Sequence, residues 1–323
     1  MEEILARKVG RLAPSPTGAL HLGNVRTFMV AWLSARSCGG KVILRMEDLD
    51  HPKDKPGAAR MAKEDLEWLG FDWDDEYVQS QRKNIYREAL DELVRKGLAY
   101  PCVCSRRDVA SAQSAPHAGE QLFYPGTCRG RFSSWKEASD FLAPAGRVPC
   151  WRFRADPGTK VSFTDAFAGA QEMDVGAVLG DFPLARDEGG AGYTLAAVTD
   201  DLLMGVTEVV RGDDLLPATP AQLLVARALL PWARTRNPGA GVPSYFHVPL
   251  VTGPDGMRLA KRHGDTRVAS FREAGWHPEE IIGFLAASCG WCASGERASL
   301  RKLIPAFCPE KIPHASFVVR NVV

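Results

Sequence analysis

The feature that most constrains the fold is one continuous stretch, Val9 to Asn24, which reads VGRLAPSPTGALHLGN. It begins as a short apolar strand, passes through a loop with two prolines and a glycine, and enters a helix after His21 and Gly23. In open α/β sheets, ligands bind where a strand leads into a helix in this way. The unpaired N–H groups and the dipole of a helix start favour phosphate. The stretch therefore predicts a nucleotide site, at which Gly18 and Gly23 allow close approach of the backbone.

Length and composition limit the class of protein further. The chain of 323 residues is long enough for two or three domains, and its 45% hydrophobic and 24% charged residues are ordinary for a globular protein. The formal net charge is only +1, so contacts with nucleic acid must come from local basic patches. We expect no signal peptide and no membrane segment. The eight dispersed cysteines favour a reducing cytoplasm and a metal site over a disulfide scaffold.

Helices and strands are expected to alternate after the opening stretch. Apolar spacing predicts helices over 22–38, 56–69 and 80–96, and a buried strand over 41–46. Ser80 is expected to cap the third helix. The buried face of that helix is predicted to hold Ile85, Ala89, Leu93 and Val94. Such alternation is typical of a doubly wound parallel sheet.

The second half of the chain is less regular. We expect strands over 151–154, 161–165 and 181–185, a return to the sheet over 193–201, and a further strand over 202–210. An amphipathic helix is predicted from Thr219 to Leu230, a short strand over 247–251, and helical structure over 271–290. Cys289 and Cys292 form a CxxC without a partner, which we interpret as core packing at a helix end.

Two charged residues at predicted strand ends are candidates for ligand contacts. Glu47 follows the strand over 41–46, where an acidic side chain can point into the ligand crevice or belong to a solvated turn. Arg211 follows the strand over 202–210 and precedes a glycine. That position suits a bidentate grip on a carboxylate, although an exposed charge in a turn fits it equally well.

Three cysteines in the middle of the chain suggest a metal centre. Cys102 and Cys104 form a CxC, and Cys128 follows a turn. Three thiols in this arrangement suggest tetrahedral Zn²⁺, against the alternative of three unrelated buried cysteines. On general metal chemistry the fourth ligand would be His117, because Cys₃His is a common structural set. A filled shell of four ligands leaves no position for a substrate, so the metal is expected to be structural.

The order of these motifs resembles the class I aminoacyl-tRNA synthetases. His21-Leu22-Gly23-Asn24 is similar to their HIGH motif, with Asn24 departing at the last position, and the segment from Arg11 to Gly18 resembles the glutamyl branch. This resemblance implies a Rossmann-type doubly wound α/β core with an inserted zinc-binding α+β module and a short helical C-terminal region. The implied divisions are 1–98 for the first half of the core, 99–190 for the insertion, 191–245 for the second half, and 246–323 for the phosphate loop and helices.

The resemblance also implies roles for individual residues. His21 and Lys261 would be catalytic. The residues implied for glutamate are Arg11, Leu12, Ala13, Pro14, Ser15, Glu47, Tyr193 and Arg211. Those implied for ATP, which carries Mg²⁺, are Thr17, Gly18, His21, Gly23, Asn24 and Lys261.

The loop around Lys261 departs from the family pattern. The segment over 258–264 resembles the KMSKS element, with Arg258 in place of its first lysine and Ala260 in place of a serine. Arg258 retains the charge, whereas Ala260 removes a hydroxyl donor. Loss of a donor to a charged partner is worth about 1.5–3 kcal/mol, so we expect slower turnover without loss of the chemistry.

A second resemblance narrows the branch. The segment Tyr124-Pro125-Gly126-Thr127-Cys128 is similar to the short glutamyl-queuosine synthetases, in which a tyrosine oxygen completes the metal site. The implied Zn²⁺ ligands are Cys102, Cys104, Tyr124 and Cys128, with His117 as the rival to Tyr124. After Gly290 too few residues remain for the anticodon-binding domain of a glutamyl-tRNA synthetase.

The implied substrates are L-glutamate, ATP and the queuosine-containing anticodon arm of tRNA(Asp). Two alternatives stay open at this point. One is a shortened glutamyl-tRNA synthetase that charges the 3′ end of tRNA(Glu), and the other is a non-enzymatic module that binds glutamate or tRNA.

Overall fold

The computed structural model describes residues 7–16, 19–49, 57–112, 123–187, 190–257, 259 and 266–319. Several predicted site residues lie outside these ranges: Thr17, Gly18, His117, Arg258, Ala260 and Lys261. Among the described residues no helix is long and apolar enough to cross a membrane.

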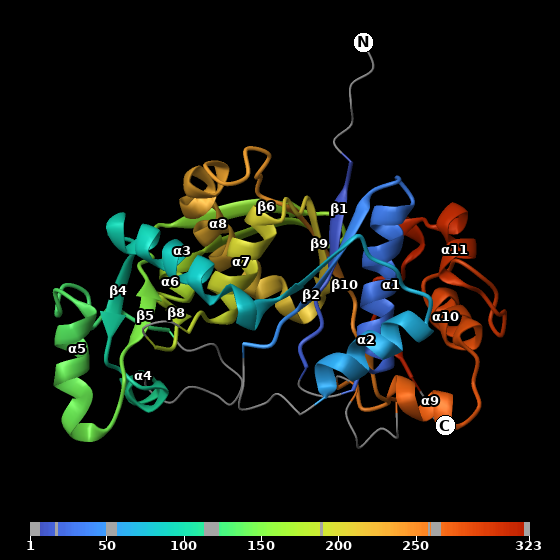
Figure 1. The fold of residues 1–323 in the computed structure, drawn as a ribbon, viewed down its shortest axis with the longest axis horizontal. Coiled ribbons are helices and arrows are strands. Elements are labelled where there is room, and N and C mark those ends of the chain that lie inside the picture. Colours follow the sequence, from blue (N-terminus) through green and yellow to red (C-terminus); the bar gives the residue numbers. More distant parts are fainter. Residues whose placement is uncertain are drawn as a thin grey trace, which may run out of the picture.

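A parallel βαβ unit opens the fold. Strand β1 (Val9–Leu12) pairs in parallel with β2 (Lys41–Met46), and β2 pairs in parallel with β3 (Asp75–Val78). Helix α1 (Leu22–Arg36) joins the first two strands and lies beside them (Figure 1). Its predicted inner residues are all fully buried: Val25, Met29, Trp32 and Leu33. The predicted strand–helix–strand start of the chain is confirmed.

A second group of strands continues the sheet beside β1. Its order is β7-β6-β10-β9, with β10 parallel to both β6 and β9. The strands are β6 (Lys160–Asp165), β7 (Gly169–Asp174), β9 (Glu208–Gly212) and β10 (Ser244–Val248). The backbone N–H of Thr207 donates to the carbonyl of Val9 at 2.9 Å, which brings the start of β9 next to β1. The amino-acid pocket predicted from β1, β2 and β9 can therefore form at one sheet edge.

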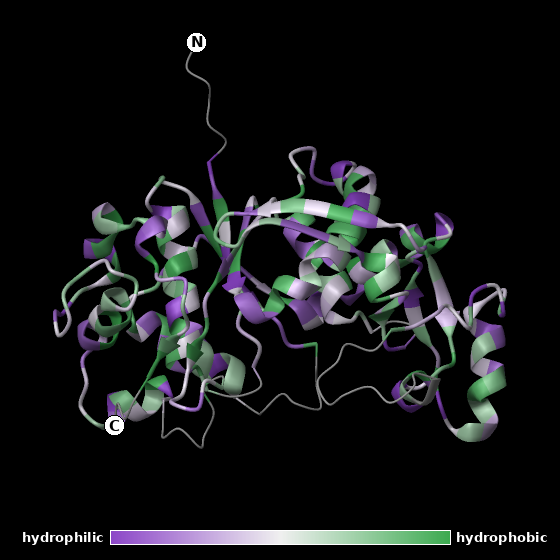
Figure 2. Ribbon diagram, turned by 180° about the vertical axis from the view of Figure 1, so that it is seen from behind, coloured by the Kyte–Doolittle hydropathy of each residue, from purple (hydrophilic) through white to green (hydrophobic). Residues whose placement is uncertain are grey.

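Helices cover this sheet in two groups, each with its own apolar core. One core joins α1 to α2 (Ala58–Trp68), α9 (Val268–Glu273), α10 (Pro278–Ala287) and α11 (Leu300–Leu303). The other joins α3 (Lys83–Arg95), α7 (Tyr193–Leu203) and α8 (Thr219–Arg234). In Figure 2 hydrophobic and hydrophilic residues alternate along these helices, as expected for elements with one face on a core. The doubly wound α/β class is confirmed.

The helix α3 differs from its prediction at its start and on its buried face. A 3₁₀ turn over Gln79–Arg82 precedes it, and Ser80 does not cap it. The Ser80 hydroxyl instead donates to the Asp48 carboxylate at 2.6 Å. Val94 is exposed and Ile85 half-buried, while Ala89 and Leu93 are buried as predicted. The remaining buried positions are Tyr86 and Leu90.

A helix, α7, covers the predicted return to the sheet over 193–201 and also the first two residues of the strand predicted over 202–210. Leu195, Val198 and Leu202 are buried at helical spacing in α7, so the apolar residues face one side of a helix. The strand begins only at Glu208, which places Arg211 inside β9 instead of after it. The predicted strand over 247–251 is also divided, because Pro249 separates β10 from β11 (Val251–Thr252), which pairs with β12 (Phe317–Val318).

The middle of the chain forms a small antiparallel sheet at one end of the molecule (Figure 1). Its strands are β4 (Ala99–Cys102), β5 (Cys150–Phe153) and β8 (Phe182–Ala185). The helices nearby are α4 (Arg106–Ala112), α5 (Trp135–Leu142) and α6 (Val175–Val178). The strands β6 and β7 of the same region instead belong to the four-stranded sheet with β9 and β10. The domain limits at residues 98, 190 and 245 stay a prediction.

Candidate active site and metal centre

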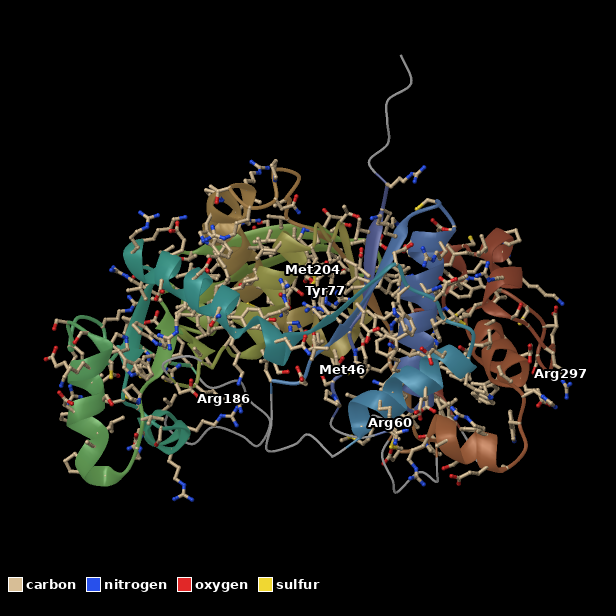
Figure 3. All side chains as sticks on the ribbon, in the orientation of Figure 1. Met46, Arg60, Tyr77, Arg186, Met204 and Arg297 are labelled. Atoms are coloured by element: carbon tan, nitrogen blue, oxygen red, sulfur yellow. The ribbon has the colours of Figure 1, made fainter. Side chains whose placement is uncertain are left out.

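A cavity of about 770 Å³ opens where β1, β2 and β9 end. Its size is in the range of small-molecule sites, and its position matches the usual ligand crevice of an open α/β sheet. Predicted glutamate or nucleotide residues that line it are Arg11, Ala13, Pro14, Ser15, His21, Gly23, Asn24, Glu47, Tyr193 and Arg211. Leu12 does not line it, because its side chain points to the opposite face of β1 and is buried in the core. The loop after β8 adds Arg186, labelled in Figure 3.

The start of α1 is capped by His21. The His21 Nδ1 accepts the backbone N–H of Gly23 at 3.1 Å, and the Asn24 side chain accepts the N–H of His21 at 3.2 Å. A Cβ on Gly23 would lie 2.9 Å from the His21 ring, so only glycine fits this cap. With Nδ1 accepting, the proton of the neutral imidazole is on Nε2.

The residues after the predicted phosphate loop are tied to this helix start. Leu22 donates its backbone N–H to Thr266 at 3.1 Å, and Val268 donates to Leu20 at 2.9 Å. Thr266 and Val268, which follow the predicted phosphate loop, thus lie beside the cap formed by His21. The position of Lys261 itself is outside the described residues.

Arg211 is a buried cation of the cavity wall, and its position is fixed by hydrogen bonds. It is 5% exposed, and all its donor nitrogens are engaged. Its acceptors are His247 Nε2 at 3.0 Å, Gln222 Oε1 at 2.7 Å, Thr219 Oγ1 at 2.8 Å, and, at 3.4 Å each, Tyr193 Oη and the Leu215 carbonyl. A guanidinium fixed in this way presents a defined edge to a carboxylate.

Glu47 and Arg11 belong to a buried network of charges at the base of the cavity. Arg45 binds Glu47 at 3.0 Å and Asp201 at 2.6 Å. Arg11 donates to the Val210 carbonyl at 2.7 Å, and its Nε lies 3.9 Å from Asp201. Among the described residues that Nε has no hydrogen-bond partner. Burial raises the pKa of the Glu47 carboxyl, against the opposing effect of Arg45 and Arg11.

Several residues of this network were missed by sequence reasoning. Arg45 and Asp201 are almost fully buried and complete the charge balance around Glu47, and Asp165 binds His247 behind Arg211. A signal was present in two cases. Arg45 is a charged residue in the apolar run KVILRM, and Asp201 follows Asp200 at the end of a segment that is rich in apolar residues. Such charges are rarely buried unless paired, so both positions indicate partners.

The predicted metal ligands meet in one small cluster. The sulfur atoms of Cys102, Cys104 and Cys128 lie within 4.8 Å of one another. The Tyr124 Oη lies 3.2 Å from the Cys102 sulfur and 3.5 Å from the Cys104 sulfur, and it accepts the backbone N–H of Cys128 at 3.0 Å. The sulfurs of Cys104 and Cys128 are 3.6 Å apart. Tetrahedral thiolates around Zn²⁺ at about 2.3 Å would be roughly 3.8 Å apart, so the donor set fits a metal.

A buried arginine lies against this cluster. Arg152 donates from Nε to the Cys102 sulfur at 3.2 Å, and its guanidinium carbon lies 3.9 Å from the centre of the Tyr124 ring. Burial raises the pKa of the Tyr124 phenol, whereas a divalent cation would lower it. Three thiolates and a phenolate around a divalent ion carry a net negative charge, which Arg152 partly offsets. The cluster could hold a metal.

A parallel sheet with a ligand crevice beside a capped helix start, joined to a cysteine cluster, defines a class I synthetase catalytic core. The family model for tRNA synthetases class I (E and Q), catalytic domain, matches residues 8–304. The chain therefore belongs to the class I glutamyl- and glutaminyl-tRNA synthetase family, within the group of glutamyl-Q tRNA(Asp) synthetases.

Several curated relatives carry that group name. The one from Symbiobacterium thermophilum is 46% identical over 94% of this chain and 93% of its own length. The one from Rhodopirellula baltica is 46% identical over 91% of this chain and 89% of its own length. A solved glutamate tRNA ligase from Elizabethkingia meningosepticum, in complex with its amino acid, superposes with a TM-score of 0.78 at 27% identity. That match covers 97% of this chain and 67% of the other.

Proposed function

We propose that this protein activates L-glutamate with ATP and transfers the glutamyl group to queuosine in the anticodon loop of tRNA(Asp). One observation carries the proposal. The cavity holds Arg11 and Arg211 together with Glu47, beside the helix start capped by His21. Two cations and one anion complement the two carboxylates and the ammonium group of glutamate. The name shared by the curated relatives supports queuosine as the acceptor.

In the first step the α-carboxylate of glutamate attacks the α-phosphorus of ATP. Glutamyl-adenylate forms and pyrophosphate leaves. Glu47 would bind the substrate ammonium group, and Arg211 with Tyr193 would bind a carboxylate. His21, the start of α1 and Lys261 would stabilise the charge that develops on the phosphates, a purely electrostatic contribution. Mg²⁺ bound to ATP would add further charge neutralisation.

In the second step a hydroxyl of queuosine attacks the activated carbonyl, an ester forms and AMP leaves. The cyclopentenediol of queuosine resembles the diol of a terminal ribose. A catalytic core that acylates a ribose could therefore accept it without new chemical groups.

We further propose that the metal is structural Zn²⁺, held by Cys102, Cys104, Tyr124 and Cys128. Four protein donors leave no position for a substrate, and none of the four residues lines the cavity. Metal analysis of the purified protein tests this, with about one zinc per chain expected. His117 is the alternative fourth ligand. None of the eight cysteines forms a disulfide, which fits a cytoplasmic enzyme.

Two assays test the function. Glutamate-dependent exchange of pyrophosphate into ATP is expected without tRNA, and labelled glutamate is then expected to enter tRNA(Asp) only when queuosine is present. Transfer to tRNA(Glu) would instead identify a shortened glutamyl-tRNA synthetase. No exchange by a folded, metal-loaded protein would indicate a binding module.

A further inference from the structure

A chain of three polar side chains crosses neighbouring strands behind the cavity. Asp165 ends β6, His247 lies in β10 and Arg211 lies in β9, and His247 and Arg211 are direct partners in the strand register. The Asp165 Oδ2 is 2.6 Å from His247 Nδ1, and Arg211 Nε donates to His247 Nε2 at 3.0 Å. Asp165 and His247 are both buried, and neither lines the cavity. They can therefore act on a ligand only through Arg211.

The contacts of Asp165 determine where the His247 proton lies. Its Oδ1 accepts the backbone N–H groups of Phe167 at 3.0 Å and Ala168 at 2.8 Å, and that of His247 at 3.3 Å. These donors, with the His247 ring, hold the pKa of Asp165 below its usual value despite burial. An ionised Asp165 can only accept, so the proton of His247 is on Nδ1. The lone pair on Nε2 then faces Arg211.

Several further groups bear on the charge of His247. Burial is the largest effect and lowers the pKa of His247. The hydrogen bond that His247 donates to Asp165 raises this pKa, and the nearby cations Arg211 and Arg11 lower it. The Tyr245 ring stacks on the imidazole at 5.9 Å between centroids and 5° between planes. A neutral imidazole fits all these contacts, since a second proton would point at the Arg211 N–H.

The partners of Arg211 separate into two sets. The three short contacts are made by His247, Thr219 and Gln222, none of which lines the cavity. The two contacts of 3.4 Å are made by Tyr193 and the Leu215 carbonyl, which both line it. The side of the guanidinium away from the cavity is thus fixed, and its weaker contacts are the ones that a carboxylate can replace.

We propose that Asp165 and His247 are positioning residues that hold Arg211 at the angle needed to bind a carboxylate of the amino-acid substrate. The proposal rests on the proposed function for the identity of that substrate. Asp165 fixes the imidazole tautomer, and the imidazole fixes the guanidinium.

The substitution Asp165→Asn tests this with almost no change of shape. The Asn side-chain oxygen still accepts hydrogen bonds from the backbone N–H groups of Phe167 and Ala168. Its NH₂ group must then face His247 Nδ1 and donate to it. The His247 proton then moves to Nε2 and opposes the N–H of Arg211, as in the wrong-tautomer effect known for Asp→Asn in a serine protease triad. We expect the KM for glutamate to rise about 10- to 100-fold, with the KM for ATP unchanged.

Substitutions of His247 provide a second measurement. His247→Gln keeps an acceptor toward Arg211 and a donor toward Asp165, whereas His247→Leu keeps neither. The Gln variant is expected to raise the KM for glutamate less than the Leu variant does. Equal effects of Gln and Leu would overturn the proposal, because they would indicate a role in packing alone. Asp174→Asn is the matched control, since Asp174 caps α6, does not line the cavity and should not alter either KM.

Nitrogen-15 NMR of the wild-type imidazoles provides a readout independent of activity. The His247 signals, assigned by their loss in His247→Gln, should report a neutral ring protonated on Nδ1. Protonation on Nε2, or an unchanged glutamate KM in Asp165→Asn, would overturn the proposal. Failure of the wild-type protein in glutamate-dependent exchange would contradict the proposed function instead, and the two failures are therefore distinguishable.

Discussion

The substitution Glu47→Gln tests the charge complementarity on which glutamate recognition depends. Arg45 forms ion pairs with both Glu47, at 3.0 Å, and Asp201, at 2.6 Å. When the Glu47 charge is removed, Arg45 keeps the shorter ion pair with Asp201. The fold should therefore survive. A substrate ammonium group loses its anionic partner, and a hydrogen bond to a charged group contributes about 1.5–3 kcal/mol. That energy corresponds to a rise of about 10- to 100-fold in the KM for glutamate.

The pH dependence provides a second signature of the same residue. Burial raises the pKa of Glu47, above the value of about 4.3 for an exposed glutamate. Protonated Glu47 cannot hold an ammonium group, so glutamate binding should weaken as the pH falls through this raised pKa. The carboxyl of the substrate titrates in the wild type and the variant alike. The part of the low-pH loss of glutamate affinity that is present in the wild type and absent in Glu47→Gln is therefore due to Glu47.

Glutamate-dependent pyrophosphate exchange measures both effects, at fixed saturating ATP and over a pH series. Glu76→Gln is the matched control, because Glu76 is an exposed residue of the neighbouring strand β3 that pairs with Lys63. We expect the control to leave the KM for glutamate unchanged. A glutamate KM that is the same in Glu47→Gln and in wild type would refute the assignment of the ammonium site.

Three further predictions concern the metal centre, the helix cap and the phosphate loop. Tyr124→Phe should weaken zinc binding at least about 10-fold in a chelator competition assay, because removal of a residue that only contacts a metal ligand already costs about 10-fold in affinity. Unchanged zinc affinity would exclude Tyr124 as a ligand. Gly23→Ala should slow exchange, because the new Cβ would lie 2.9 Å from the His21 ring. Gly241→Ala is the control, because a Cβ at Gly241 would meet no atom within 4 Å. Equal exchange rates for the two variants would contradict this prediction. Lys261→Ala should weaken exchange about 10- to 100-fold with zinc content unchanged, and intact exchange would disprove its role at the phosphates.

The sequence determined the features that depend on local order along the chain. The stretch from Val9 to Asn24 predicted the first strand and the helix that begins after His21, because hydrophobic period, prolines and glycines act over a few residues. The spacing of Cys102, Cys104 and Cys128 likewise predicted a cluster, which the fold brings together within 4.8 Å.

Only the tertiary structure decided which charged residues are buried next to one another. Asp165 and His247 are 82 positions apart and Arg45 and Asp201 are 156 apart, so no local pattern links either pair. Tertiary packing also decided that the residues before β9 form a helix, since an apolar run fits either a buried strand or a buried helix. The physical reason is common to both cases. A buried charge is stable only beside a partner, and an apolar face only against a surface, and folding supplies both across long separations.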